Sequence, residues 1–165
     1  MSNEIKILDR VQVTQKILRL AWDIYENNFD EKELVLVGIG EKGMIIAQEL
    51  LTNLCQISSI SPILTRLDIN IDISTDSKMD LLEDEFKDKV IILCDDVLHS
   101  GKTLIYASKV FLTTSIKKMS VLVLIDRNHN SYPIKANYVG LSLSTTLKEY
   151  IKVILSGDNQ GVYLS

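Results

Sequence analysis

The sequence predicts an α/β protein with a mostly parallel, twisted sheet of about five strands flanked by helices. The expected strands are short and almost wholly apolar, at residues 34–37, 63–69, 90–94, 120–125 and 137–141. Uninterrupted apolar runs of this kind are typical of parallel strands that are buried on both faces. Stretches with helical spacing alternate with these runs, so we expect helices on both sides of the sheet.

The ends of the chain add a capped helix and a hairpin to this core. Asp9 and Gln12 match a capping box, and the apolar residues that follow them recur at helical spacing. Residues 150–155 and 161–164 flank the turn Gly157-Asp158-Asn159 and predict a terminal hairpin. Residues 70–88 are polar and acidic without a clear period, which predicts a flexible loop.

Length and composition narrow the class of protein. With 165 residues, the chain predicts a single domain (1–165). A net charge of −4 and a pI near 5.2 give no reason to expect general nucleic-acid binding, and they leave a local basic face open. No apolar run approaches the roughly 20 residues of a membrane span, so we expect no membrane partner. Cys55 and Cys94 lack a CxxC spacing and stand in apolar segments. They predict reduced, buried thiols in a cytoplasmic protein.

The most informative segment is VIILCDDVLHSGKT, residues 90–103. Asp95 and Asp96 directly follow an apolar strand, where carboxylates are costly to bury unless a ligand hydroxyl or a metal-bound sugar compensates them. Gly101 permits close approach of the backbone, and the following helix start offers free N–H groups that suit a phosphate. Carboxylates for a ribose and N–H groups for a phosphate together predict a site for ribose 5-phosphate.

Two alternatives for this segment are weaker. An acidic turn before an ordinary helix start would not require strand, double acid, hydroxyls, glycine and helix in this one order. A Walker P-loop requires a glycine five positions before Gly101, and Asp96 stands there instead. Its carboxylate would repel the phosphates of a nucleotide.

A glycine-rich loop at residues 38–43 follows an earlier strand. Its GxGxxG spacing, with Asp68 at the end of the next strand, keeps a nicotinamide-binding Rossmann domain as a third hypothesis. That hypothesis leaves Asp95 and Asp96 unexplained and leaves no room for a substrate domain. The loop also suits a diphosphate, held by its N–H groups and by the charge of Lys42, although a solvated surface lysine is the commoner fate of a lysine.

Residues 90–103 resemble the 5-phosphoribosyl 1-diphosphate (PRPP) signature of type I phosphoribosyltransferases: apolar strand, Asp-Asp, two apolar residues, then Ser/Thr-Gly-x-Thr. The resemblance implies the type I phosphoribosyltransferase fold, with a small hood that includes the C-terminal hairpin. It also implies Mg²⁺ as cofactor, with Asp95 and Asp96 catalytic and contacting the metal only through ligand or water. The implied PRPP contacts are Asp95, Asp96, Val97, Leu98, His99, Ser100, Gly101, Lys102 and Thr103. The implied diphosphate contacts are Ile39, Gly40, Glu41, Lys42 and Gly43.

A longer likeness covers most of the chain. The segment VLIDRNH at residues 123–129, followed by PIKANYVG at residues 133–140, resembles the pyrimidine operon attenuator/uracil phosphoribosyltransferase family. The resemblance implies that Arg127 and His129 contact the base. Without it, a surface ion pair of Asp126 with Arg127, and an ordinary loop histidine, would be the simpler interpretation.

The chain departs from that family at three places. The stretch after Asp68 is short and acidic, and only Lys78 supplies a base there. His99 and Lys102 stand where the family usually has Tyr and Arg. Asn130 and Leu141 replace basic residues that the family uses to bind RNA, leaving Lys135.

The predicted function is transfer of ribose 5-phosphate from PRPP to a pyrimidine base, with uracil favoured, to give UMP and diphosphate. The alternative is a PRPP- or UMP-sensing, RNA-binding regulator of pyrimidine genes with little or no catalysis. The acidic pI and the depleted basic turn disfavour RNA as a partner. A homodimer or higher homo-oligomer is the expectation that the family implies.

Overall fold

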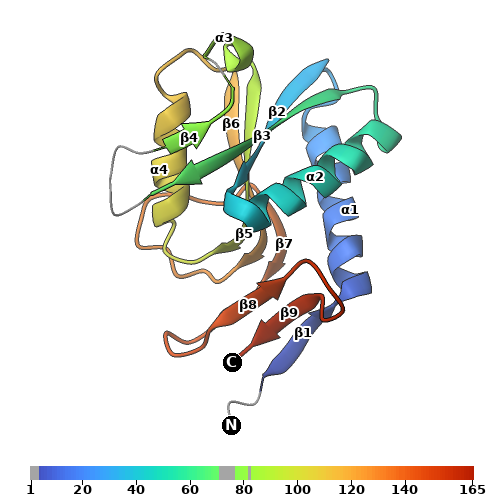
Figure 1. Cartoon of the computed structure of the whole chain (residues 1–165), viewed down its shortest axis with the longest axis vertical. Helices are drawn as coiled ribbons and strands as arrows, with labels where there is room; N and C mark the ends of the chain where they lie inside the picture. The colour runs from blue at the N-terminus through green and yellow to red at the C-terminus, as the bar shows by residue number, and fades with distance from the viewer. Residues whose placement is uncertain (1–3, 71–76, 82) are drawn as a thin grey trace.

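The computed structural model describes residues 4–70, 77–81 and 83–165. Within these ranges the main sheet has six strands in the order β4-β3-β2-β5-β6-β7, as Figure 1 shows. Neighbouring strands run parallel except β3 and β4, which are antiparallel. Their bounds are β2 (Glu33–Ile39), β3 (Ser61–Ile69), β4 (Ser77–Met79), β5 (Val90–Leu98), β6 (Lys118–Asp126) and β7 (Tyr138–Ser142). The predicted α/β fold with its five parallel strands is confirmed.

Helices cover both faces of this sheet (Figure 1). Helices α1 (Arg10–Asn27) and α2 (Gly40–Ile57) pack on one face, and α3 (Glu83–Phe86) and α4 (Lys102–Phe111) pack on the other. Alternate residues of β2 divide between the two cores, with Leu36 facing α1 and α2 and Val37 facing α4. All four strand residues 34–37 are fully buried, which explains why the run has no polar position.

Helix α1 begins as the sequence predicts. The Asp9 carboxylate accepts a hydrogen bond of 2.8 Å from the Gln12 N–H, and the Gln12 side chain accepts one of 2.9 Å from the Asp9 N–H. This reciprocal capping box satisfies two N–H groups that the first turn leaves unpaired. At the other end, the buried Asn28 donates 2.7 Å from its amide to the Ile24 carbonyl.

A second, three-stranded sheet forms the hood. The predicted terminal hairpin is present as β8 (Ile151–Ile154) and β9 (Gly161–Leu164), which pair antiparallel. The sequence did not predict β1 (Ile5–Asp9), which pairs antiparallel with β9 and completes the hood in the order β1-β9-β8. Figure 1 shows this sheet beside the end of the main sheet where β5 and β7 terminate.

Two of the predicted loops are shorter than expected. Gly38 and Ile39 belong to β2, and residues 40–43 form the first turn of α2 rather than a loop. The strand after residue 94 continues through Leu98, because its parallel pairing with β6 extends to Asp126. The loop between β5 and α4 is therefore limited to residues 99–101.

The acidic segment 70–88 is not wholly a loop. Residues 77–79 form β4 at the edge of the sheet, and α3 follows at residues 83–86. Phe86 is 1% exposed and packs edge-to-face on Phe111 with ring centroids 5.1 Å apart, which anchors this part of the chain. Residues 71–76 and 82 of the predicted flexible loop lie outside the described residues.

The two cysteines differ in environment. Cys94 is buried in β5 as predicted, but Cys55 is exposed on α2, so the prediction of a buried thiol is wrong there. Residue 55 lies on the solvent side of an amphipathic helix whose buried side is formed by Ile46, Leu50 and Leu54. No helix in the described ranges is long and apolar enough to span a membrane.

Candidate functional site

The paired carboxylates lie near the carboxyl end of the central strand β5. Asp95 and Asp96 are partly exposed, and four fully buried residues, 91–94, precede them. The Asp95 carboxylate accepts a hydrogen bond of 2.9 Å from the Asp96 N–H. Ligands of parallel α/β sheets bind beyond the carboxyl ends of the strands, so this pair lies where a ligand is expected.

Residues 99–101 join this strand end to α4. Gly101 is the N-cap residue of the helix and has a left-handed φ of 86°. A Cβ there would also lie 2.4 Å from the Ile134 side chain, so conformation and space both require glycine. The Ser100 hydroxyl accepts from the Lys102 N–H at 3.2 Å.

A small hollow lies inside this loop. Its lining includes Asp95 and all the predicted PRPP contacts except Asp96: Val97, Leu98, His99, Ser100, Gly101, Lys102 and Thr103. N–H groups in the first turn of α4 have no partner within the helix, and together with the positive end of its dipole they favour an anion there. The predicted contacts are therefore gathered around one hollow at a helix start.

The first turn of α2 meets the same region from the neighbouring strand. Lys42 Nζ lies 3.5 Å from the Asp96 carboxylate, which brings together the two motifs that the sequence singled out. Gly43 makes the approach possible, because a Cβ there would lie 2.4 Å from the Cys94 carbonyl oxygen. Gly40 has a φ of 64° with open space around it. Ile39 is buried at the end of β2, and Glu41 is exposed.

The electrostatics of the carboxylate pair favour a ligand that carries hydroxyls. Burial raises the pKa of Asp95 well above its ordinary value, and the charge of Asp96 raises it further, while Lys42 acts in the opposite direction. The confined environment of the two carboxyl groups therefore disfavours a full negative charge on both of them at once. Hydroxyl groups of a sugar can hydrogen-bond to one ionised and one protonated carboxyl without adding charge.

Arg127 connects this loop to the hood. Its Nη1 donates to His99 Nδ1 at 2.9 Å, and its Nε donates to the Thr145 hydroxyl at 2.8 Å. Its Nη2 donates to the carbonyls of Thr146 at 3.1 Å and Glu149 at 2.7 Å. The guanidinium group is thus committed to four protein acceptors, three of them in residues 143–150, which we call the hood loop.

His129 binds the same loop. Its Nε2 donates to the Thr145 carbonyl, so the described structure pairs both predicted base contacts with residues 145–149. Asp126 accepts from the Asn128 N–H at 2.8 Å instead of pairing with Arg127, and Asn128 takes a left-handed φ of 59°. The ion pair considered from the sequence does not form.

Several residues that complete this region had no signal in the sequence. The Ser100 carbonyl accepts from the N–H groups of Ser131 at 2.9 Å and Tyr132 at 3.0 Å. The Tyr150 ring stacks on His99 with centroids 6.2 Å apart and planes inclined by 17°. These contacts join residues 31 to 51 positions apart, so only the folded chain reveals them.

The described residues suit Mg²⁺ only as part of a ligand complex. No group of three or more His, Cys, Asp or Glu side chains comes together in residues 4–70, 77–81 and 83–165. Asp95 and Asp96 are two hard oxygen donors, and Mg²⁺ usually binds one or two carboxylates with water and substrate phosphate. The donor set therefore suits an Mg²⁺ ion that takes most of its ligands from water and a bound substrate, and the indirect contact stays a prediction.

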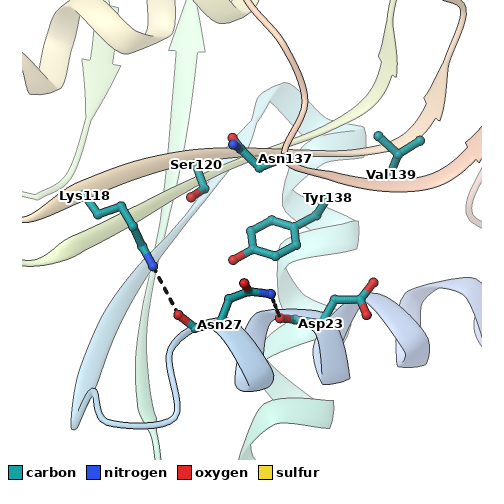
Figure 2. A pocket seen from close by; sticks show the side chains of 7 residues that line it. All are labelled: Asp23, Asn27, Lys118, Ser120, Asn137, Tyr138 and Val139. Carbon is teal, nitrogen blue, oxygen red and sulfur yellow. Dashed lines mark hydrogen bonds between the residues drawn. The ribbon is translucent and has the colours of Figure 1, made fainter.

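A separate polar cavity of about 490 Å³ lies at the amino ends of β6 and β7, where α1 ends (Figure 2). Asn27 donates 2.8 Å to the Asp23 carbonyl, and Lys118 donates 3.2 Å to the Asn27 carbonyl. Parallel strands place this cavity at the end of the sheet opposite to the carboxylate pair. It is distinct from the candidate site.

Known proteins match both the sequence and the fold. The family model described as "Phosphoribosyl transferase domain" matches residues 5–154. A protein named "Bifunctional protein PyrR" from Clostridium acetobutylicum is 37% identical, and the alignment covers 95% of this chain and 93% of the relative. The protein of the same name from Alkaliphilus metalliredigens is 34% identical, over 94% of this chain and 90% of the relative.

Solved structures resemble the whole fold at lower identity. A hypoxanthine-guanine phosphoribosyltransferase from Bacillus anthracis superposes with a TM-score of 0.72 at 18% identity, over 84% of this chain and 81% of the other. The hypoxanthine phosphoribosyltransferase of Trypanosoma cruzi gives 0.73 at 15% identity, over 88% and 83%. The chain belongs to the phosphoribosyltransferase domain family and is by class a pentosyltransferase.

Proposed function

We propose that this protein transfers the 5-phosphoribosyl group of PRPP to uracil, giving UMP and diphosphate. The observation that carries the proposal is the meeting of Asp95 and Asp96 with the α4 N-terminus on one side and Lys42 on the other. A ribose, its 5-phosphate and its diphosphate are the three groups that these elements suit. The choice of uracil depends on the relatives named PyrR and on the segment 123–140 that resembles theirs.

In the proposed reaction the bond from ribose C1 to the diphosphate oxygen breaks, and a bond from C1 to the base nitrogen forms. The base nitrogen loses its proton to solvent, so charge and atoms balance. The loop at residues 99–103 would hold the 5-phosphate, and this anchoring would fix C1 between base and diphosphate. Asp95 and Asp96 would hold the ribose hydroxyls and lie near the positive charge that develops at C1, as in glycoside hydrolysis.

The leaving diphosphate needs neutralisation. The N–H groups of the first turn of α2 and the Lys42 ammonium supply part of it. Mg²⁺ bound with the diphosphate would supply the rest as a Lewis acid, with Asp95 and Asp96 contacting it only through ligand or water.

A screen of bases tests the proposal. The protein is incubated with PRPP, Mg²⁺ and, in turn, uracil, hypoxanthine, guanine and xanthine, and diphosphate release is measured. We expect release with uracil, and we expect Asp95→Asn/Asp96→Asn to lower kcat/KM by at least about a hundredfold, as loss of a preorganised electrostatic contact typically does. An unchanged fold in circular dichroism is the control for the double variant. Absence of diphosphate release with uracil would refute the proposal, whatever the other three bases do.

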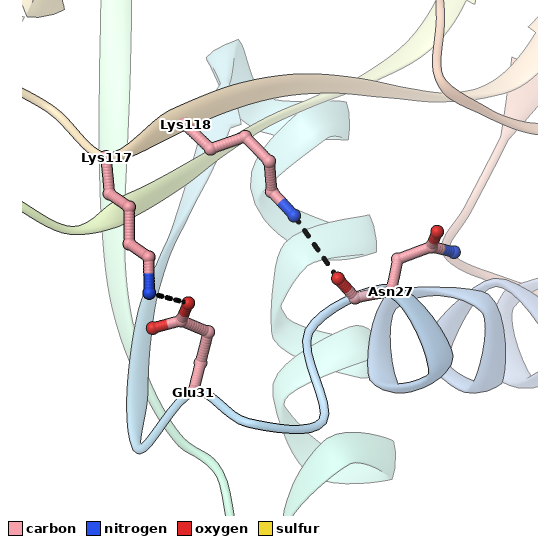
Figure 3. Close-up of polar contacts among 4 residues, drawn as sticks. All are labelled: Asn27, Glu31, Lys117 and Lys118. Carbon is pink, nitrogen blue, oxygen red and sulfur yellow. Dashed lines mark hydrogen bonds and ion pairs between the residues drawn. The ribbon is translucent and has the colours of Figure 1, made fainter.

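The name "Bifunctional" of the relatives favours a second candidate, a PRPP- or UMP-sensing protein that binds RNA of pyrimidine genes. Two neighbouring lysines near the start of β6, which could contact RNA phosphates, already have protein partners. Lys117 pairs with Glu31, and Lys118 donates to the Asn27 carbonyl, as Figure 3 shows. Both lysines tie β6 to the connection between α1 and β2, so neither ammonium is unengaged for phosphate contacts.

Binding to a pyrimidine-operon leader RNA, measured without ligand, with UMP and with PRPP at several salt concentrations, tests this candidate. Affinity that changes with UMP or PRPP and falls steeply with salt would support it. Affinity unaffected by both ligands would exclude it.

A further inference from the structure

His99 makes a side-chain contact with Arg127 that the predicted reaction does not use. His99 follows β5 and lies three positions after Asp96 in the loop that surrounds the small hollow. One edge of its ring meets Arg127 at 2.9 Å, and its face stacks on Tyr150. Both partners belong to other parts of the chain, so His99 is where the predicted PRPP loop meets the hood loop.

We propose that His99 and Arg127 form a latch that positions the hood loop over the predicted PRPP loop, and that the latch holds only while Nδ1 of His99 is unprotonated. An arginine guanidinium has donors only, so Nδ1 must be the acceptor in this contact. A proton on Nδ1 would remove the acceptor and place two cations 2.9 Å apart. The latch is therefore incompatible with imidazolium.

The hood loop depends strongly on this one guanidinium. Arg127 binds one side chain and two carbonyls of residues 145–149, and His99 is its remaining acceptor. Thr145 is 7% exposed, and its carbonyl also accepts from His129. Turning Arg127 away from a charged His99 would loosen the three hydrogen bonds that Arg127 makes with the hood loop.

The charges that face His99 come from several elements. Asp96 lies on β5, Lys42 on α2, Arg127 after β6, and Tyr150 stacks from the hood loop. Burial of the ring and the charge of Arg127 lower the pKa of His99, Asp96 raises it, and Lys42 lowers it slightly. The net lowering keeps the ring neutral around neutral pH. The latch is thus intact above the lowered pKa and opens as pH falls through it.

Asparagine provides a matched variant. Its side-chain oxygen can take the place of Nδ1 as an acceptor and does not titrate. His99→Phe keeps an aromatic ring for Tyr150 but has no acceptor. The chain has two histidines, so His129→Gln, which keeps an amide donor for the Thr145 carbonyl, leaves His99 as the sole histidine. The hydrogen-exchange and nuclear magnetic resonance series use this background, whereas the kinetic series keeps His129 because that residue is a predicted base contact.

Amide hydrogen exchange of residues 143–150 is measured without substrate from about pH 5 to pH 8, and nuclear magnetic resonance follows the His99 ring in parallel. After correction for intrinsic rates, exchange should rise about tenfold as the ring gains its proton, the scale expected for losing a charge-assisted hydrogen bond. His99→Asn should abolish this step, and His99→Phe should raise exchange at every pH. Residues 121–125 of β6 serve as the unchanging control.

A step in exchange that does not coincide with the His99 titration would overturn the latch, as would normal protection in His99→Phe. Only the catalytic part of the test rests on the proposed function. In steady-state kinetics, KM for the base should rise by a larger factor than kcat falls as pH is lowered through the His99 titration. His99→Asn should flatten this pH dependence. Exchange that follows His99 in a protein without turnover would refute the proposed function and leave the latch standing.

Discussion

Buried polar side chains differ in whether the fold supplies hydrogen-bond partners for them. Asp95 and Asp96 share a confined space, and the cost of their charges is understandable if a sugar replaces the water they lose. Thr145 and Thr65 are both buried, but they differ in whether their hydroxyl groups have a hydrogen-bond partner. The Thr145 hydroxyl accepts from Arg127, whereas the Thr65 hydroxyl has no partner among the described residues.

The same substitution at these two threonines should therefore have opposite consequences. Thr65→Val removes an unsatisfied hydroxyl and should leave the free energy of unfolding unchanged or raise it by up to about 1 kcal/mol. Thr145→Val leaves a guanidinium N–H unpaired and should lower it by about 1–3 kcal/mol. Urea denaturation of both variants checks the pair. A larger loss at Thr65 than at Thr145 would contradict this account.

At the scale of elements, the contact between α2 and β5 decides how close the diphosphate and ribose halves of the site can be. Gly43 allows the helix to touch the strand backbone at Cys94. Propensity and packing make opposite predictions for Gly43→Ala. Helix propensity alone predicts a gain of up to about 1 kcal/mol. The 2.4 Å contact predicts overpacking, which typically costs about 1–3 kcal/mol.

We expect packing to prevail at Gly43, so the variant should melt earlier and bind PRPP more weakly. Thermal unfolding and calorimetric titration with PRPP measure the two effects. Gln48→Ala, on the exposed side of the same helix, is the control and should stay within about 0.5 kcal/mol of the wild type. A stabilised Gly43→Ala would show that the helix can shift outward freely.

The sequence predicted some elements better than others for physical reasons. Buried parallel strands leave an unmistakable apolar run, so the strands containing residues 34–37 and 90–94 were found. β1 was missed because its exposed Ile5 and partner Leu164 are far apart in sequence, and pairing between them leaves no local pattern. The carboxylate pair and Gly101 were identified because local chemistry defines them. Tyr150 and Thr145 were not, because their roles arise from packing across the chain.

At the scale of the molecule, two sheets share one hydrophobic core. Leu8 of β1 is 5% exposed and packs with residues of the main sheet and of the hood. Leu8→Ala should lower the free energy of unfolding by about 2–5 kcal/mol, the usual cost of truncating a buried leucine. Ile5→Ala on the same strand, at a position 58% exposed, should change it little.

Chemical denaturation of the two variants measures this difference. Exchange of β8 and β9 amides would locate the damage, because the hood should loosen before the main sheet does. Equal losses at Leu8 and Ile5 would mean that the hood contributes nothing specific to the common core.

The pairing of β1 with β9 also orders events during synthesis. β1 leaves the ribosome first among the strands, and its partner at residues 161–164 leaves last, after every strand of the main sheet. A nascent chain can therefore assemble the carboxylate pair and the loop around it while nothing yet covers them. Translation that stops before β9 would leave β1 without its partner and the predicted sugar-phosphate site without a closed hood. We therefore expect synthesis of residues 161–164 to be the step that turns an open site into one that the hood covers.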